Sequence, residues 1–317
     1  MKFSITIPAY KGQYLDEAIH SVCQQTYGNW ELIIVDDFSP DNLEAIISPY
    51  LKDCRISYYR NMTNCGALRV VDNWNICLSH CTGDFVICMG DDDRLTPTSL
   101  EHYAHLIKEY PNLNVYHGRT QIINSEGTIV DQQEIRPSYE SMLSLIWNRW
   151  DNRNKQYIGD FCYNRIFLQS IGGYVWQPLA WGADDMTAVL AAQEKGIANT
   201  ESYCFQYRDN HLTISRNTSY AMIKIKATLY QYTWYTQLLE QIAKQPMEPA
   251  DLQLLKTIHH PKYTYYYKSL GKECTDYIKG NPLRLLECYQ LLKPVHFSPL
   301  AFCKWYASSI YHIFKTS

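Results

Sequence analysis

The chain has 317 residues, of which 29 are Lys or Arg and 32 are Asp or Glu, so its formal net charge is −3. This length suffices for one large α/β domain with an extension, or for two domains. A chain without a basic excess does not attract nucleic acid through its overall field, so we expect no nucleic-acid partner.

Eleven cysteines are scattered along the chain, an odd number with no C-x-x-C pair. This usage predicts reduced thiols in the cytoplasm rather than a disulfide framework or a zinc site. The apolar segment 3–7 is too short for the core of a signal peptide. No apolar run reaches the roughly eighteen residues that a membrane-spanning helix needs, so we expect a cytoplasmic protein.

The first 113 residues alternate between apolar strand patterns and helical patterns. The expected strands are 2–7, 31–35, 55–60 and 85–89, and the expected helices are 14–25, 42–51 and 67–80. Thr96 and Pro97 are predicted to open the next helix, with Thr as the N-cap. Such an order predicts a parallel sheet with right-handed crossovers.

The fourth expected strand runs directly into three carboxylates, Asp91, Asp92 and Asp93. Open α/β sheets bind ligands at the carboxyl ends of their strands, where this loop falls. Hard cations such as Mg²⁺ and Mn²⁺ take oxygen ligands, usually one or two carboxylates plus diphosphate oxygens. The loop therefore predicts a Mn²⁺ or Mg²⁺ site for a nucleoside diphosphate. The alternative is a solvated acidic turn.

Two other strand ends carry candidate ligand-binding residues. Tyr10 follows the first strand, and Asp36 and Asp37 follow the second. On a parallel sheet these ends lie along one edge, where a ring, a carboxylate and a metal-binding loop can hold a base, a ribose and a diphosphate. Neither the G-x-G-x-x-G fingerprint nor the P-loop motif is present to explain the arrangement.

The pattern changes after residue 113. A hairpin is expected at 115–124 and 128–130, helices at 138–150, 165–170 and 187–195, and a strand at 201–207. Asp184 and Asp185 precede the last of these helices, and their plain interpretation is that acids near a helix N-terminus suit the helix dipole.

From residue 219 onward the sequence predicts only helices, at 219–245, 249–258, 262–279, 282–292 and 298–315. Two interpretations of 298–315 remain open. This apolar and aromatic segment can make peripheral contact with a membrane interface. Alternatively, it packs on its own domain or on a second subunit in a homodimer.

Several motifs together resemble the inverting glycosyltransferases of family 2. They are Ile-Pro-Ala-Tyr, Ile-Ile-Val-Asp-Asp-Phe-Ser, Asn-Trp-Asn, Gly-Asp-Phe-Val-Ile-Cys-Met-Gly-Asp-Asp-Asp-Arg-Leu-Thr-Pro, Ile-Gly-Gly-Tyr, Gly-Ala-Asp-Asp, and His211 with Ser215. The resemblance implies an α/β GT-A fold, a Rossmann-like mixed sheet flanked by helices. It covers 1–217, with a nucleotide-binding half (1–113) and an acceptor half (114–217). Residues 218–317 match no family and form an all-helical C-terminal extension.

The resemblance also assigns roles to residues at the matching positions. Pro8 and Tyr10 would line and stack on the donor base, and Asp37 would read the edge of that base. Asp92 would lie nearer the ribose and Asp93 on the metal.

Three further positions receive less specific roles. Asp91 and His211 are further metal-ligand candidates, and a structural role for His211 is equally open. Asp185 falls on the family's general base. Asp184 takes the place of the Glu in the family's Glu-Asp pair, so which of the two acids reaches the acceptor stays open.

By this resemblance the chain is an inverting, metal-assisted transferase that uses a nucleotide-diphosphate sugar, a UDP-sugar by preference. The acceptor class would be a glycan or a lipid-linked precursor of a bacterial surface polysaccharide, at the inner face of the plasma membrane. Two alternatives stay open. A sugar-1-phosphate nucleotidyltransferase would need a Gly-rich basic loop after the first strand, for which Pro8-Ala9-Tyr10-Lys11-Gly12 is a poor substitute. A non-catalytic carbohydrate-binding or nucleotide-sugar-binding protein would use the aromatic residues.

Overall fold

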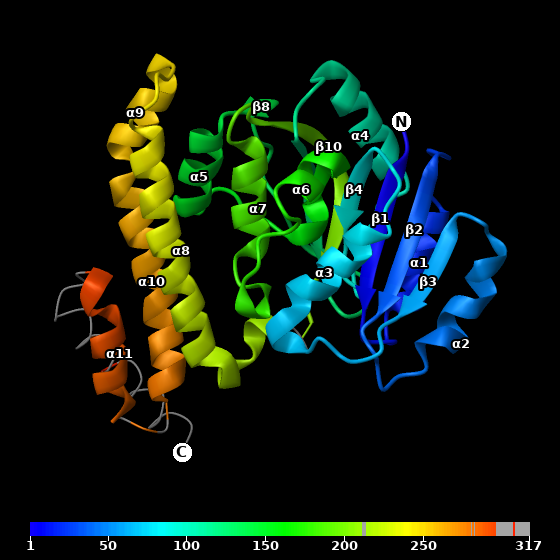
Figure 1. The fold of residues 1–317 in the computed structure, drawn as a ribbon, viewed down its shortest axis with the longest axis horizontal. Coiled ribbons are helices and arrows are strands. Elements are labelled where there is room, and N and C mark those ends of the chain that lie inside the picture. The colour runs from blue at the N-terminus through cyan, green and yellow to red at the C-terminus, as the bar shows by residue number, and fades with distance from the viewer. Residues whose placement is uncertain (211–213, 280, 282, 296–306, 308–317) are drawn as a thin grey trace. The chain divides into compact units, whose positions relative to one another are not determined.

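The computed structural model describes residues 1–210, 214–279, 281, 283–295 and 307 (Figure 1). The chain divides into two compact units. The first comprises Met1–Arg149 and Arg153–His211, and the second comprises Trp150–Asn152 and Leu212–Ser317.

The first unit is built on a mixed sheet in which the strand order is β3-β2-β1-β4-β9-β6-β10-β5. The two remaining strands are attached at the side, β7 to β6 and β8 to β10. The strands are β1 (Phe3–Ala9), β2 (Trp30–Asp36), β3 (Ile56–Arg60), β4 (Phe85–Cys88), β5 (Arg94–Leu95), β6 (Val115–Ile123), β7 (Ile129–Gln132), β8 (Tyr139–Glu140), β9 (Phe161–Asn164) and β10 (Ile197–Arg208).

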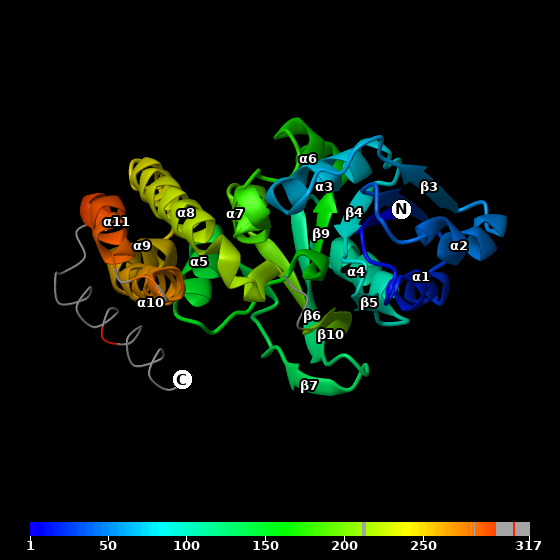
Figure 2. The same ribbon diagram turned by 90° about the horizontal axis from the view of Figure 1, so that it is seen from below.

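Helices cover both faces of this sheet. They are α1 (Leu15–Cys23), α2 (Leu43–Ile47), α3 (Val70–Ser79), α4 (Ser99–Glu109), α5 (Met142–Trp150), α6 (Arg165–Ser170) and α7 (Ala183–Ala192). In Figure 2, α3 and α6 lie on one side of the sheet and α1 and α4 on the other. This arrangement confirms the predicted α/β class with a mixed sheet.

The strand directions place several strand ends on one edge. β3, β2, β1 and β4 are mutually parallel, as predicted. β9 is antiparallel to both β4 and β6, and β10 is parallel to β6. β6 and β10 therefore run in the same direction as β4, and their carboxyl ends share its edge of the sheet. All seven residues of β2 are buried, as expected for a strand covered on both faces.

Glu31 fixes the segment that enters β4. Its carboxylate accepts hydrogen bonds from Ser4 Oγ at 2.6 Å, Lys2 Nζ at 2.6 Å, and both the backbone N–H (2.6 Å) and the hydroxyl (2.7 Å) of Thr82. Burial alone would raise the pKa of Glu31, but these bonds outweigh burial and lower it to about 2.

This depressed pKa predicts a specific loss of stability in acid. The contribution of Glu31 is complete above its ordinary pKa of 4.5 and is lost as the pH falls towards 2. The shift corresponds to roughly 3 kcal/mol. Because the folded-state pKa of about 2 lies below this range, we expect urea unfolding of the wild type to lose about 2 kcal/mol more free energy between pH 5 and pH 2.5 than unfolding of Glu31→Gln. Equal pH slopes for the two proteins would contradict the assignment.

Several helix boundaries differ from the prediction, including three helix starts. The helix expected to open at Thr96 begins at Ser99, because Arg94 and Leu95 form β5 and the Thr96 N–H continues that pairing by donating to the Cys204 carbonyl at 3.1 Å. The helix expected from residue 138 begins at Met142, because residues 139–140 pair with β10. The helix expected from residue 187 begins at Ala183, which places Asp184 and Asp185 within its first turn.

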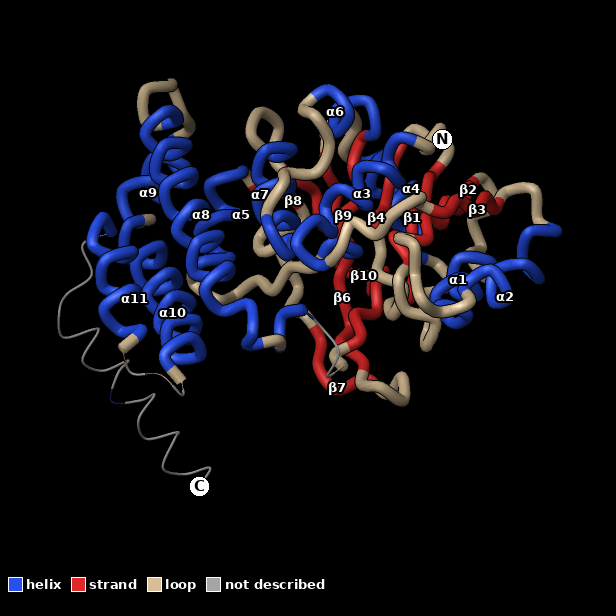
Figure 3. Tube along the Cα trace, turned by 60° about the horizontal axis from the view of Figure 1, so that its bottom comes forward, coloured by secondary structure: helices blue, strands red, loops and turns tan. Residues whose placement is uncertain are grey.

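The second unit is helical throughout its described residues. Its α-helices are α8 (Ala221–Ile242), α9 (Pro249–Thr257), α10 (His259–Ile278) and α11 (Arg284–Leu292), and Figure 3 shows no strand among them. These four agree with the predicted helical extension. The helix expected at 298–315 lies outside the described residues. Within the described part of the chain, no helix has both the length and the apolar character needed to cross a membrane.

Candidate active site

The acidic loop, residues 91–93, is attached to the end of β1. Asp91 Oδ2 accepts hydrogen bonds from the backbone N–H groups of Tyr10 and Lys11, both at 2.7 Å. Because β1 and β4 are parallel neighbours, their carboxyl ends bring these residues together from 81 positions apart in the chain. The structure therefore confirms that the first and fourth strand ends meet. One carboxylate oxygen of Asp91 thus holds the acidic loop against the residues that follow β1.

The other two acids bind the end of β10. The Asp93 carboxylate is only 4% exposed and accepts the Arg208 N–H at 2.9 Å. Asp92 Oδ2 accepts from Asn210 Nδ2 at 2.7 Å. A Cβ on Gly90 would lie 2.8 Å from Asp93 Oδ2, so any other residue here would require this carboxylate to shift.

The electrostatics of the loop favour a bound cation. Burial, followed by the charge of Asp92, raises the pKa of Asp93 well above its usual range. The same two causes raise the pKa of Asp91 to about 6. A divalent cation would relieve this repulsion, and carboxylate oxygens suit Mn²⁺ or Mg²⁺. No three His, Cys, Asp or Glu side chains of the described residues form a complete metal site, and His211 lies outside those residues. A cation held by one or two of these carboxylates would take diphosphate oxygens and waters as its other ligands.

Asp37 is fixed at the end of β2. Its backbone N–H donates to the Ala9 carbonyl at 2.8 Å, which ties it to β1. Its Oδ1 accepts from Asn61 Nδ2 and from the Cys65 N–H, both at 2.9 Å, and the side chain is 7% exposed. The second oxygen takes neither bond, so it is available to an N–H group on the edge of a base.

Two exposed aromatic residues follow the ends of β1 and β2. Tyr10 is 41% exposed and Phe38 is 50% exposed. Phe38 has φ +52, a left-handed conformation that is uncommon for a residue other than glycine and occurs preferentially at functional sites. Pro8 lies in β1 opposite Val35 and is partly buried. Sequence reasoning missed Phe38. The available signal was its position, an apolar residue between two acids and the turn-forming Ser39-Pro40.

Asp184 and Asp185 lie in the first turn of α7. The Asp184 carboxylate accepts the N–H of Asp185 at 2.9 Å. Arg149 Nε lies 3.0 and 2.9 Å from the two carboxylate oxygens of Asp185, so this acid is held in an ion pair that the sequence did not predict. Burial raises the pKa of Asp185, and Arg149 offsets part of that effect. Burial and the charge of Asp185 raise the pKa of Asp184 to about 7, and Asp184 is the more exposed of the two.

A stacked tyrosine pair lies within electrostatic reach of Asp93 through Tyr207 and of Arg149 through Tyr157. The rings of Tyr157 and Tyr207 are 4.2 Å apart and nearly parallel. Burial, followed by the charge of Asp93, raises the pKa of Tyr207. Burial also raises the pKa of Tyr157, which lies within electrostatic reach of Arg149, the partner of Asp185.

Arg208 donates hydrogen bonds to the acidic loop and is a second residue that sequence reasoning missed. It is fully buried at the carboxyl end of β10. Its Nε donates to the Asp92 carbonyl at 2.8 Å, and its Nη2 donates to Glu17 on α1 at 2.6 Å. The guanidinium also lies 4.1 Å from the centre of the Tyr14 ring. A cation after a strand end is a weak signal, because most such residues are solvated.

Because Arg208 contacts both Glu17 and the acidic loop, a change at Glu17 should alter nucleotide binding at that loop. Glu17→Gln removes the carboxylate partner of a buried cation, so we expect the free energy of unfolding to fall by about 1–3 kcal/mol. We also expect Mn²⁺-dependent nucleotide binding to weaken severalfold. Urea unfolding and calorimetric titration measure the two effects. The exposed acid Glu44 on α2 gives the matched control, Glu44→Gln. Equal values for the two variants would contradict this support.

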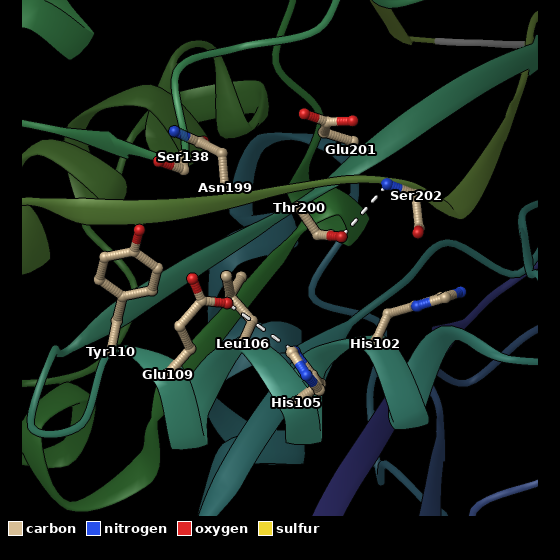
Figure 4. A pocket seen from close by; sticks show the side chains of 10 residues that line it. All are labelled: His102, His105, Leu106, Glu109, Tyr110, Ser138, Asn199, Thr200, Glu201 and Ser202. Atoms are coloured by element: carbon tan, nitrogen blue, oxygen red, sulfur yellow. Dashed lines mark hydrogen bonds and ion pairs between the residues drawn. The ribbon is translucent and has the colours of Figure 1, made fainter.

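A hollow lies between α4 and β10 (Figure 4). Its volume is about 320 Å³, and none of the predicted site residues lines it. His105 and Glu109 on its helical side are 3.8 Å apart and mostly exposed.

The family is established by comparison with known proteins. The family model described as "Glycosyl transferase family 2" matches residues 4–171, more than half of the chain. The chain belongs to glycosyl transferase family 2. The matched segment contains Tyr10, Asp37 and the acidic loop and ends before α7.

Curated relatives share part of this segment. WcaA of Escherichia coli (strain K12), a putative colanic acid biosynthesis glycosyl transferase, is 41% identical over 106 residues, which are 32% of this chain and 37% of WcaA. The putative glycosyltransferase EpsE of Bacillus subtilis (strain 168) is 36% identical over 32% of this chain and 36% of its own length. WfgD of Escherichia coli, a UDP-Glc:alpha-D-GlcNAc-diphosphoundecaprenol beta-1,3-glucosyltransferase, is 31% identical over 44% of this chain and 54% of its own length. The chain thus spans less than two thirds of each relative.

Solved structures share the fold over nearly the whole chain. S. aureus TarS 1-349 in complex with UDP-GlcNAc has a TM-score of 0.64 at 18% identity, covering 98% of this chain and 90% of the other. The mannosyltransferase PcManGT from Pyrobaculum calidifontis, in complex with GDP-Man and Mn²⁺, has a TM-score of 0.51 at 13% identity, covering 98% and 84%. With the family assignment, these likenesses confirm the predicted GT-A fold.

Proposed function

We propose that the chain transfers a sugar, with inversion, from a UDP-sugar to a glycan or lipid-linked acceptor, assisted by Mn²⁺ or Mg²⁺. The proposal rests on two hydrogen bonds that join the ends of β1, β2 and β4. The Tyr10 N–H donates to the Asp91 carboxylate, and the Asp37 N–H donates to the Ala9 carbonyl. These bonds gather an exposed ring, a base-reading carboxylate and the acidic loop on one edge of the sheet. UDP-GlcNAc bound to TarS supports the donor class.

On the donor side, Tyr10 stacks on the base with Pro8 beneath it, and Asp37 accepts from the base edge. Asp92 contacts the ribose. Asp93 would hold the metal, Asp91 and His211 are the further candidate ligands, and a structural role for His211 is equally open. When bound, the cation offsets the charge that develops on the departing diphosphate. The Mn²⁺ in the PcManGT complex supports a divalent cation in this fold.

On the acceptor side, Asp185, or Asp184 beside it, takes the proton of the acceptor hydroxyl as that oxygen attacks the anomeric carbon. A positioned base contributes on the order of 10²–10⁴-fold to the rate. Arg149 holds the Asp185 carboxylate in a fixed orientation through its contacts with both oxygens. The diphosphoundecaprenol-linked substrate in the name of WfgD supports a lipid-linked acceptor.

A thermal-shift screen of UDP, GDP, ADP and CDP, each with and without Mn²⁺, tests the donor site. A ligand that binds only the folded state at 100 times its Kd stabilises that state by about 2.7 kcal/mol. We expect UDP with Mn²⁺ to give the largest rise in Tm. No rise with any nucleoside diphosphate would overturn the proposed function.

A further inference from the structure

The second unit contains a cavity of about 390 Å³ bordered by α8, α9 and α10. This volume falls within the roughly 300–1,000 Å³ that is usual for small-molecule sites. Its lining residues are Tyr232, Thr236, Leu239, Glu240, Ala243, Leu255, His259, Lys262 and Tyr263. Every one of them belongs to the second unit, so this cavity is separate from the residues of the proposed donor site.

A buried cation lines this cavity. Lys262 is 5% exposed, and its ammonium lies 4.2 Å from the centre of the Tyr232 ring. The ammonium also donates to the Thr236 hydroxyl, whose own proton is given to the Tyr232 carbonyl at 2.6 Å. Among the described residues, no carboxylate lies within 4 Å of this nitrogen. An ammonium has three donors, and these two contacts leave one for a ligand.

A second buried lysine of the same unit, Lys224, has more nearby acids than Lys262. Lys224 is equally buried, and it donates to the Asn217 carbonyl at 2.9 Å and feels the charges of Glu273 and Asp276. Lys262 feels the charge of one acid, Glu240, which is exposed at the rim of the cavity. Burial lowers the pKa of Lys262 to about 8, so the ammonium remains charged at pH 7. A buried charge with so little compensation is costly unless an anion joins it.

Part of the remaining wall of the cavity is apolar, beside Glu240, His259 and Tyr263. Leu239 is buried, Leu255 is partly buried, and Ala243 lies directly after the last residue of α8. We propose that this cavity binds an anionic amphiphile, with its acidic head on the Lys262 ammonium and its alkyl chain along Leu239 and Leu255. The acidic head is common to a lipid phosphate and a fatty-acid carboxylate. This site does not depend on the proposed transferase activity.

Calorimetric titration of the full chain below the micelle concentration tests the proposal. We expect dodecyl phosphate and laurate to bind, dodecyl maltoside with its neutral head to bind at least tenfold more weakly, and inorganic phosphate without a chain to bind at least tenfold more weakly. The tighter of the first two identifies the phosphate or the carboxylate source. Equal binding of dodecyl maltoside and dodecyl phosphate would overturn the proposal, as would absence of binding by both anionic amphiphiles.

Two variants link the binding to the cavity. Lys262→Met keeps the length of the side chain and removes the buried charge, so we expect it to fold at least as stably as the wild type and to bind dodecyl phosphate at least tenfold more weakly. Lys256→Met removes an exposed charge from α9 outside the cavity lining and should bind as the wild type does. Equal affinity of Lys262→Met and the wild type would also overturn the proposal.

Discussion

Asp93→Asn is expected to abolish the Mn²⁺-dependent part of nucleotide binding without weakening the fold. The Asp93 carboxylate is 4% exposed, and burial and Asp92 raise its pKa well above the usual range. An acid whose pKa is raised by folding destabilises the protein at neutral pH, so the neutral amide should leave Tm unchanged or higher. The amide lacks the charge that a divalent cation requires, so the affinity gained from Mn²⁺ should disappear.

Calorimetric titration of UDP with and without Mn²⁺ measures this gain, and a tenfold loss corresponds to about 1.4 kcal/mol. Asp84, an exposed acid just before β4 at the opposite end of the same strand, provides the control Asp84→Asn. The assignment of Asp93 to the metal fails if Asp93→Asn keeps the Mn²⁺ dependence of the wild type.

Asp185→Asn is expected to lower turnover by about 10²–10⁴-fold while UDP binding persists. The amide keeps the size of the side chain but cannot accept the proton of an acceptor hydroxyl. Release of UDP from a UDP-sugar in the presence of acceptor measures turnover, and titration with UDP measures donor binding. A variant with full turnover would exclude Asp185 as the base.

Asp184→Asn decides between the two neighbours. Asp184 is the more exposed acid, and its pKa is raised to about 7 by burial and by the charge of Asp185. If Asp184 is the base, turnover of the wild type should rise with pH through about 7 as its proton is lost, and Asp184→Asn should suffer the larger loss. If Asp185 is the base, Asp184→Asn should retain most of its turnover.

The core strands and the junction at their ends could be predicted because local signals agree there. Four apolar runs separated by helical patterns determine the order of β1 to β4, and parallel pairing then places Tyr10, Asp37 and the acidic loop on one edge. The predicted start of α4 was wrong. Thr96 and Pro97 resemble a helix start, but the pairing of β5 with β10, a contact between distant segments, takes precedence there.

The contacts that position the charged groups could not be predicted. The pairing of Arg149 with Asp185, and of Arg208 with Glu17 and the Asp92 carbonyl, joins residues 36 to 191 positions apart. No periodicity in the sequence encodes such pairs.

A crystal structure of the chain with UDP and Mn²⁺ measures the central claim most directly. The account predicts the uracil on the Tyr10 ring with its edge at Asp37, the metal on Asp93 bridging to the diphosphate, and the carboxylates of Asp184 and Asp185 facing the sugar side of that diphosphate. A nucleotide bound elsewhere, or a diphosphate beyond the reach of both helix α7 acids, would contradict it.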